Sequence, residues 1–305
     1  MNIKKRVFSL LSSCYVVGCL FAQNILISTP ATSLVLSAPE KGELKYIYYG
    51  AKLSDRDFQT IGSLDKGKYA AYPVYGLNCP SEVALAVKHN DGNMTLQLEV
   101  VKVESSHQDE ANLTIISLKD KVYPFYVKMF YKAYQDTDII EIWSEISHQE
   151  KKTVVLNQFA SAYLPIRKGD VWLSHLYGAW ANEGRLEEVP LEAGMKVIKN
   201  KDGVRNSHTA HAEVMFSLDG KPRENEGRVI GAALCYSGNY KLRIDTDESD
   251  YHHFFAGINE DNSTYNLKNG EIFRTPELAL TYSDEGLSGS SRNFHRWARL
   301  HKLAN

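Results

Sequence analysis

The sequence has 305 residues, of which 43% are hydrophobic, and its 35 basic side chains nearly balance its 37 acidic ones. This length and composition allow a sizeable core and exclude wholesale disorder. The balanced charge argues against a nucleic-acid or anionic-membrane binder, because either would need a clustered basic surface. Tyrosine is the outlier: 18 Tyr, with 11 Phe and 4 Trp, favour strands and sugar-facing surfaces over a helical bundle.

The first 22 residues are typical of a secretory signal peptide. A basic segment at 4–6 precedes a mostly apolar stretch at 7–18, which is too short to span a bilayer comfortably. Leu20-Phe21-Ala22 then fits a cleavage site before Gln23. In the alternative interpretation, Val-Val-Gly-Cys forms a bacterial lipoprotein box with Cys19 as the lipidated residue. Either pattern predicts that the mature chain is secreted or periplasmic.

From residue 23 onward the sequence predicts one strand after another. Apolar and polar residues alternate with period two in several runs, at 96–101, 127–132 and 140–142. This period is typical of half-buried antiparallel strands. Asn-Asp-Gly-Asn at 90–93 predicts a hairpin between the runs 83–89 and 94–103. No helical period of ten or more residues appears before the C-terminus. We therefore expect an all-β sandwich of two large stacked antiparallel sheets.

The last residues, 290–305, break this pattern and predict a short C-terminal α-helix. Ser290 and Ser291 are good N-caps. An apolar face follows at i, i+3, i+4 and i+7, made of Phe294, Trp297, Ala298 and His301. Such a face must be buried, either against the sandwich or as a connector into a further domain, and we favour the connector.

No local pattern predicts a metal, a cofactor or a catalytic residue. His208 and His211 would share one face of a helix and could bind a metal there, but their surroundings predict loop and strand. The sequence has no glycine-rich phosphate loop and no G-x-S-x-G elbow. Carboxylates are plentiful, yet nothing nominates a catalytic pair among them.

Aromatic residues beside polar turns are the better functional signal. The segments 72–78 and 176–183 each combine aromatic rings, glycine and side-chain amides. Such groups suit sugars, because the C–H faces of a sugar stack on rings while its hydroxyls take hydrogen bonds. The alternative is that Tyr75 and Trp180 only pack in the core or at its rim, and the sequence leaves both interpretations open.

Several short motifs share their order and spacing with a known family. They lie at 180–185, 207–208, 236–239, 256–259, 267–277, 282–286 and 294–296. Together they resemble the bacterial α-galactosidases of glycoside hydrolase family 36, over a stretch from about Tyr46 to the C-terminus. The resemblance implies a β-supersandwich domain at 23–289. It also implies that the helix at 290–305 would lead into a (β/α)8 barrel of ~250 residues that is absent here.

Catalysis in that family is retaining and uses two aspartates of the barrel, neither of which has a counterpart in this sequence. The resemblance therefore implies the N-terminal domain of a secreted α-galactosidase, which shapes the active-site rim and is not catalytic alone. The implied partners are α-galactoside oligosaccharides and the barrel. The family sometimes builds the rim from a neighbouring subunit, so a homo-oligomer is a further implied partner.

The resemblance and the aromatic segments together nominate four rim residues for substrate binding, namely Tyr75, Asn78, Trp180 and His208. The sequence departs from the family at 78–82, where Asn-Cys-Pro-Ser-Glu stands in place of an acidic-aromatic-arginine stretch. Two other functions remain open. One is a stand-alone carbohydrate-binding β-sandwich protein, and the other is an enzyme such as a lyase or epimerase with carboxylates on the sandwich, which no motif supports.

Overall fold

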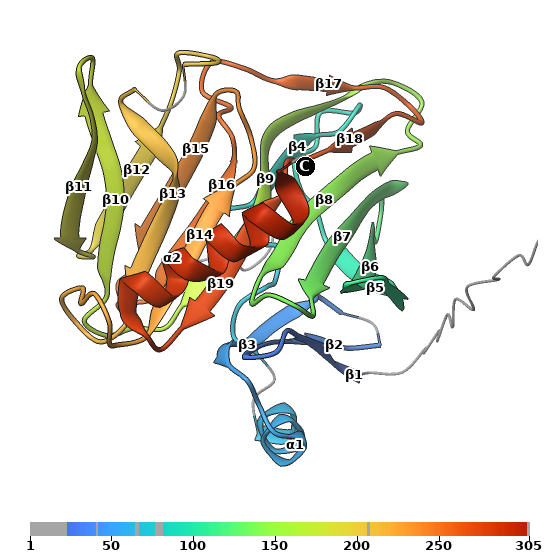
Figure 1. Ribbon diagram of the computed structural model, residues 1–305. Helices are drawn as coiled ribbons and strands as arrows, with labels where there is room; N and C mark the ends of the chain where they lie inside the picture. The colour runs from blue at the N-terminus through green and yellow to red at the C-terminus, as the bar shows by residue number, and fades with distance from the viewer. Residues whose placement is uncertain (1–22, 41, 65–66, 77–81, 206–207, 304–305) are drawn as a thin grey trace, which may run out of the picture.

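The computed structural model describes residues 23–303 except 41, 65–66, 77–81 and 206–207. The predicted signal peptide, the alternative lipidation at Cys19 and the candidate Asn78 lie outside the described residues. Strands dominate the described chain and form three antiparallel sheets (Figure 1). Within this described part, every helix is too short or too polar to cross a membrane.

The N-terminal sheet has three strands, β1 (Gln23–Ser28), β2 (Thr32–Ala38) and β3 (Lys45–Ala51). Helix α1 (Asp55–Leu64) follows and projects below this sheet in Figure 1. The sequence did not predict this helix, because its described residues are mostly exposed and give little apolar periodicity. Its start is fixed instead by Ser54, whose Oγ accepts a hydrogen bond from the Asp57 N–H at 3.2 Å.

The largest sheet has ten strands, ordered β11-β10-β13-β14-β19-β8-β7-β6-β5, with β18 pairing on β8. Its strands are β5 (Leu98–Gln108), β6 (Ala111–Asp120), β7 (Phe125–Tyr134), β8 (Ile140–His148), β10 (Trp172–Ala179), β11 (Asn182–Pro190), β13 (Ala210–Ser217), β14 (Val229–Leu234), β18 (Ile272–Arg274) and β19 (Leu278–Ser283).

The second large sheet has six strands, ordered β12-β15-β16-β9-β17, with β4 pairing on β9. Its strands are β4 (Leu85–Lys88), β9 (Val154–Ile166), β12 (Gly194–Lys199), β15 (Tyr240–Thr246), β16 (His252–Ile258) and β17 (Tyr265–Leu267).

The core lies between the two large sheets. Phe216 of β13 packs edge-to-face on Phe254 of β16, with 5.1 Å between ring centroids, and both side chains are fully buried. Each such burial contributes about 1.5–3 kcal/mol. Buried Tyr72 links the sheets, because its hydroxyl donates to the carbonyl of Ala160 in β9 at 2.8 Å and lies 3.3 Å from Ser144 Oγ in β8. The predicted all-β class with two large antiparallel sheets is confirmed.

The predicted hairpin around 90–93 is wrong. The turn itself forms, since the His89 N–H donates to the Asn93 carbonyl at 2.8 Å and Gly92 has a φ of 92°. However, β4 pairs with β9 and β5 pairs with β6, so the two runs enter different sheets. Turn residues determine where the chain reverses. Which strands then pair depends on where the apolar face of each strand can be buried.

The C-terminal helix begins earlier than expected. Helix α2 spans Gly286–Trp297 and continues as a five-residue π-helix, η1 (Ala298–Lys302). The prediction that Ser290 and Ser291 cap it is wrong, because both lie inside the helix and Ser290 is fully buried. The helix packs back on β13, β14 and β19 (Figure 1). Whether it also connects to a further domain stays a prediction.

A glycine of the sheet permits this packing. Phe216 and its cross-strand partner Ile230 face the core, so the next residue of β14, Gly231, faces the helix. A Cβ at Gly231 would clash with Ser290 Oγ and would lie 2.7 Å from a ring carbon of Phe294. The helix therefore sits against bare backbone, on the face of the sheet that points away from the core.

Candidate functional site

Trp180 and His208 lie at the same end of the ten-stranded sheet. Trp180 stands in the turn of the β10–β11 hairpin, and His208 stands in the loop that leads into β13. Because β10 pairs with β13, the two turns are adjacent: the Gly178 N–H donates to the Thr209 carbonyl at 3.1 Å. In Figure 1 the hairpin forms an outer edge of the molecule. We call Trp180, the residues 177–185 around it and His208 the hairpin tip.

The backbone conformation of the hairpin tip is tightly constrained. A Cβ at Gly178 would lie 2.6 Å from the Asn182 carbonyl oxygen, so only glycine allows the strands to approach here. Ala181 adopts a left-handed φ of 59°, and its N–H donates to Glu183 Oε1 at 3.0 Å. These constraints leave the Trp180 side chain 83% exposed, which is unusual for an indole.

Below the tip, polar contacts hold the two strands of the hairpin together and tie them to the rest of the protein. The Arg185 guanidinium lies over the Tyr177 ring, 5.3 Å from its centroid. Glu187 accepts a hydrogen bond from Lys196 of β12 at 2.9 Å, and its Oε2 lies 2.5 Å from His175 Nε2. The hydrogen bond from Lys196, followed by that from His175, lowers the pKa of the Glu187 carboxyl. The carboxylate therefore clamps the edge hairpin to the other large sheet.

This arrangement suits binding rather than catalysis. An exposed indole face can stack on the C–H face of a sugar, and exposed amide and carboxylate groups beside it can take hydrogen bonds from hydroxyls. Among the residues that the structure describes, no group of three or more His, Cys, Asp or Glu is arranged to hold a metal ion. His208 and His211 belong to a loop and a strand and do not share a helical face.

Tyr75 lies elsewhere. Its N–H donates to the carbonyl of Leu85 in β4 at 3.0 Å, and its own carbonyl accepts from the Leu96 N–H at 2.9 Å. It thus belongs with the six-stranded sheet, half exposed, whereas the hairpin tip belongs to the ten-stranded sheet. The structure brings together two of the nominated residues and separates the third.

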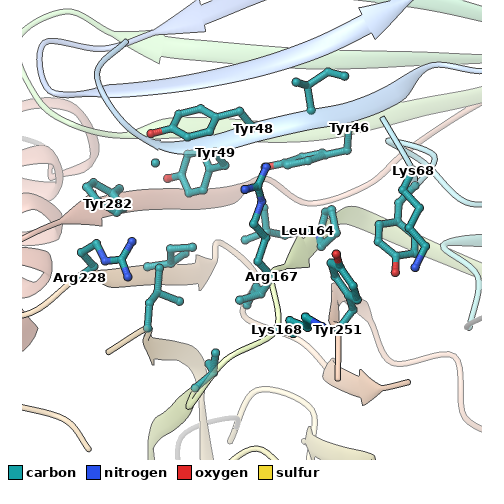
Figure 2. Close-up of a pocket in the computed structure, with 18 of the residues that line it drawn as sticks. Tyr46, Tyr48, Tyr49, Lys68, Leu164, Arg167, Lys168, Arg228, Tyr251 and Tyr282 are labelled. Atoms are coloured by element: carbon teal, nitrogen blue, oxygen red, sulfur yellow. The ribbon is translucent and has the colours of Figure 1, made fainter. Parts of the chain in front are cut away.

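Sequence reasoning missed a concave feature elsewhere on the molecule. A cleft of about 340 Å³ opens between β3 and the segment that follows β9, and Figure 2 shows its tyrosine and basic side chains. The clue in the sequence was the dense tyrosine run Tyr-Ile-Tyr-Tyr at 46–49. That run was visible as a composition bias, but most of the other residues that line the cleft under β3 lie more than 100 positions away in the sequence.

The comparisons with known proteins agree with this architecture. Residues 42–268 match the model of the glycosyl hydrolase family 36 N-terminal domain, and the chain belongs to this family. The α-galactosidase Mel36A of Lactobacillus acidophilus is 27% identical, with 86% of this chain aligned to 40% of the relative. The α-galactosidase AgaA of Geobacillus stearothermophilus is 30% identical over 193 residues, which cover 63% of this chain and 26% of the relative.

Solved structures show the same fold. AgaA in complex with stachyose superposes with a TM-score of 0.85 at 23% identity, covering 93% of this chain and 44% of that one. The α-galactosidase of Lactobacillus brevis gives a TM-score of 0.82 at 22% identity, covering 91% and 42%. This chain therefore spans less than half the length of the proteins that it resembles.

Proposed function

We propose that this chain serves as the non-catalytic N-terminal domain of a secreted α-galactosidase and that its hairpin tip forms part of the active-site rim. The observation that carries the proposal is the family match combined with its coverage: the chain aligns with only 40% of Mel36A and 32% of the α-galactosidase/sucrose kinase AgaSK of Mediterraneibacter gnavus. The catalytic barrel would supply the two carboxyl groups that a retaining mechanism requires.

In this proposal Trp180 provides a stacking surface for an α-galactoside oligosaccharide. Support comes from its 83% exposure on a hairpin whose backbone and base are both fixed. A rigid, exposed aromatic side chain gives contact area at low entropic cost. Export from the cytoplasm, with or without lipidation at Cys19, and assembly into a homo-oligomer belong to the same proposal.

The first test is turnover of a chromogenic α-galactoside by the purified chain. We expect no turnover above the buffer rate, because catalysis needs the barrel. Robust turnover that is lost when residues of this chain are changed would overturn the non-catalytic assignment and would favour an enzyme with its own site.

The second test joins this chain to the remaining segment of Mel36A and measures hydrolysis of raffinose. We expect Trp180→Ala to raise KM about fivefold, the equivalent of about 1 kcal/mol, with a smaller change in kcat. Val122→Ala is the control, because Val122 is 78% exposed in the turn between β6 and β7, toward the opposite edge of the same sheet. Equal KM values for both variants would show that the hairpin tip is not part of the active-site rim.

A stand-alone carbohydrate-binding protein is the second candidate function, and the exposed indole of Trp180 favours it. Calorimetry with raffinose separates the two functions. Binding by the chain alone that disappears in Trp180→Ala would favour the stand-alone binder, whereas absence of binding by the folded chain favours a rim that needs the barrel.

A further inference from the structure

The end of the C-terminal helix is held differently from its beginning. Helix α2 packs on β13, β14 and β19, and its last residue, Trp297, is buried. None of the five residues of η1 (Ala298–Lys302) is buried, and its π-helical turn is closed by a hydrogen bond from the Leu303 N–H to the Ala298 carbonyl at 2.9 Å. We call η1 the C-terminal strap. Short π-helical turns often mark functional sites.

The strap adjoins a small cluster of buried apolar side chains that is separate from the main core. The cluster lies at one end of the ten-stranded sheet and consists of Ala111, Tyr134, Ile139, Ala279 and Trp297. Ala298, the first residue of the strap, packs against it. Because this cluster is small and separate, opening of the strap does not require the main core to unfold.

His301 ties the strap to two turns of this sheet. The Gln135 N–H donates to the Glu110 carbonyl at 2.7 Å, so the β5–β6 turn and the β7–β8 turn lie side by side. His301 Nε2 lies 2.9 Å from Asp136 Oδ2 and 3.0 Å from Asp136 Oδ1. Its Nδ1 lies 3.6 Å from Glu110 Oε2. Both ring nitrogens of His301 therefore face a carboxylate.

The protonated form of His301 fits this arrangement better than the neutral form. A neutral imidazole has one N–H, so its other nitrogen would direct a lone pair at a carboxylate, whereas an imidazolium donates from both nitrogens. The His301 side chain is only 8% exposed, which limits screening by water, while the Glu110 side chain is 66% exposed and leaves the site open to protons. The closed strap therefore binds a proton more tightly than the open strap does.

A second ion pair joins the strap to the sheet. The Lys302 ammonium pairs with the buried carboxylate of Glu141, which also accepts a hydrogen bond from the Tyr134 hydroxyl at 3.0 Å. Lysines and carboxylates ordinarily change charge outside the range of about pH 5 to about pH 8, in which histidine does. Burial raises the pKa of the Tyr134 phenol, and it raises the pKa of the nearby Cys235 thiol to about 11. His301 is therefore the member of this cluster suited to sense that range.

We propose that the C-terminal strap is a pH-sensitive conformational switch, closed on the sheet when His301 is protonated and loosened when His301 is neutral. Because the closed state binds the proton more tightly, closure strengthens as the pH falls and weakens as the pH rises through the range in which histidine titrates. In an α-galactosidase that contains this chain as its N-terminal domain, the switch would set how firmly the end of the domain is held, and this consequence rests on the proposed function. The switch itself does not.

Backbone amide hydrogen exchange, followed by mass spectrometry on the purified chain, tests the switch. Exchange rates at about pH 5 and about pH 8 are corrected for the intrinsic effect of pH on amide exchange. We expect the protection of residues 298–302 to be at least about fivefold higher at the lower pH. The protection of β14 should be the same at both pH values, which shows that the sheet stays folded.

Substitutions separate the switch from simple attachment of the strap. His301→Gln should leave the strap equally weakly protected at both pH values, and Asp136→Asn should reduce the pH dependence. Lys302→Gln should lower the protection at both pH values but keep a similar ratio between them, because its ion pair does not need the histidine proton. His295→Gln is the matched control, since His295 is an exposed histidine of the same helix, and it should behave as the wild type does.

Three results would overturn the proposal. Equal protection of the strap at both pH values in the folded wild type would show that closure does not depend on a proton. A pH dependence that persists in His301→Gln, or one that is lost in His295→Gln, would assign the proton to another group. None of these results changes the expected outcome of the raffinose tests, so the two proposals fail separately.

Discussion

The hairpin tip and the cleft under β3 present aromatic side chains in opposite ways. At the hairpin tip a single indole projects 83% exposed from an edge hairpin, beside polar side chains of both charges. In the cleft, tyrosines are recessed between sheets and surrounded by basic groups. The projecting ring suits a rim that meets a large partner, whereas the recessed wall suits enclosure of a small ligand. The same residue class thus serves two different kinds of surface.

The largest expected effect is on the hairpin tip. Gly178→Val would place a Cβ 2.6 Å from the Asn182 carbonyl, and backbone cannot move aside as a side chain can. We expect a loss of about 2–3 kcal/mol in the free energy of unfolding, measured by urea titration, together with faster amide exchange across 177–185.

Gly184→Ala controls for the left-handed backbone of the same turn. Gly184 has a φ of 70° but has open space around it, so alanine there should cost only about 1 kcal/mol. If the two substitutions cost the same, close packing does not shape the hairpin tip.

The second prediction contrasts tyrosine hydroxyls that differ in their partners. Tyr72→Phe removes a hydroxyl that donates to the Ala160 carbonyl at 2.8 Å, and we expect it to cost about 1–2 kcal/mol in urea titration. Tyr46→Phe removes a buried hydroxyl with no partner among the described residues, so it should be neutral or stabilise by up to about 1 kcal/mol. A cost for Tyr46→Phe equal to that for Tyr72→Phe would mean that the Tyr46 hydroxyl already has a hydrogen-bond partner.

The comparison also explains what could be predicted from the sequence. Period-two alternation at 127–132 correctly located the interior of β7, because strand periodicity is local and one face of the strand is buried. The hairpin tip was found because its ring, glycine and amide residues are contiguous in sequence. Its closeness to His208 could not be predicted, because it depends on the β10–β13 pairing, which joins two segments some 30 positions apart.

The cleft could not be found in this way. Its walls come from β3, from the end of β9 and from residues near 228, 251 and 282. No short stretch of sequence contains them together. The bulge at Ile47 also interrupts the period-two alternation from which the two faces of β3 could have been predicted. Helix α1 was missed for a related reason, since capping at Ser54 rather than a buried apolar face defines it.

The smallest expected effect concerns the clamp below the hairpin tip. Hydrogen bonds from Lys196 and then His175 lower the pKa of Glu187 in the folded protein below its ordinary value of 4.5. A depressed folded pKa contributes stability that is fully present above the unfolded pKa and is lost as the pH falls through the folded pKa. Because the Glu187 side chain is 38% exposed, the clamp should be worth only about 0.5 kcal/mol at pH 7.

Glu187→Gln should therefore be less stable than the wild type at pH 7, and this deficit should shrink as the pH falls, as measured by urea titration over a series of pH values. Glu188→Gln is the control for loss of a carboxylate on this strand, because the neighbouring side chain points to the other face of β11. If the deficit of Glu187→Gln stays the same as the pH falls, the carboxylate charge does not hold the hairpin. The rigidity of the tip would then rest on the close approach at Gly178 alone, and the exposed indole would be positioned by backbone packing rather than by contact with the second sheet.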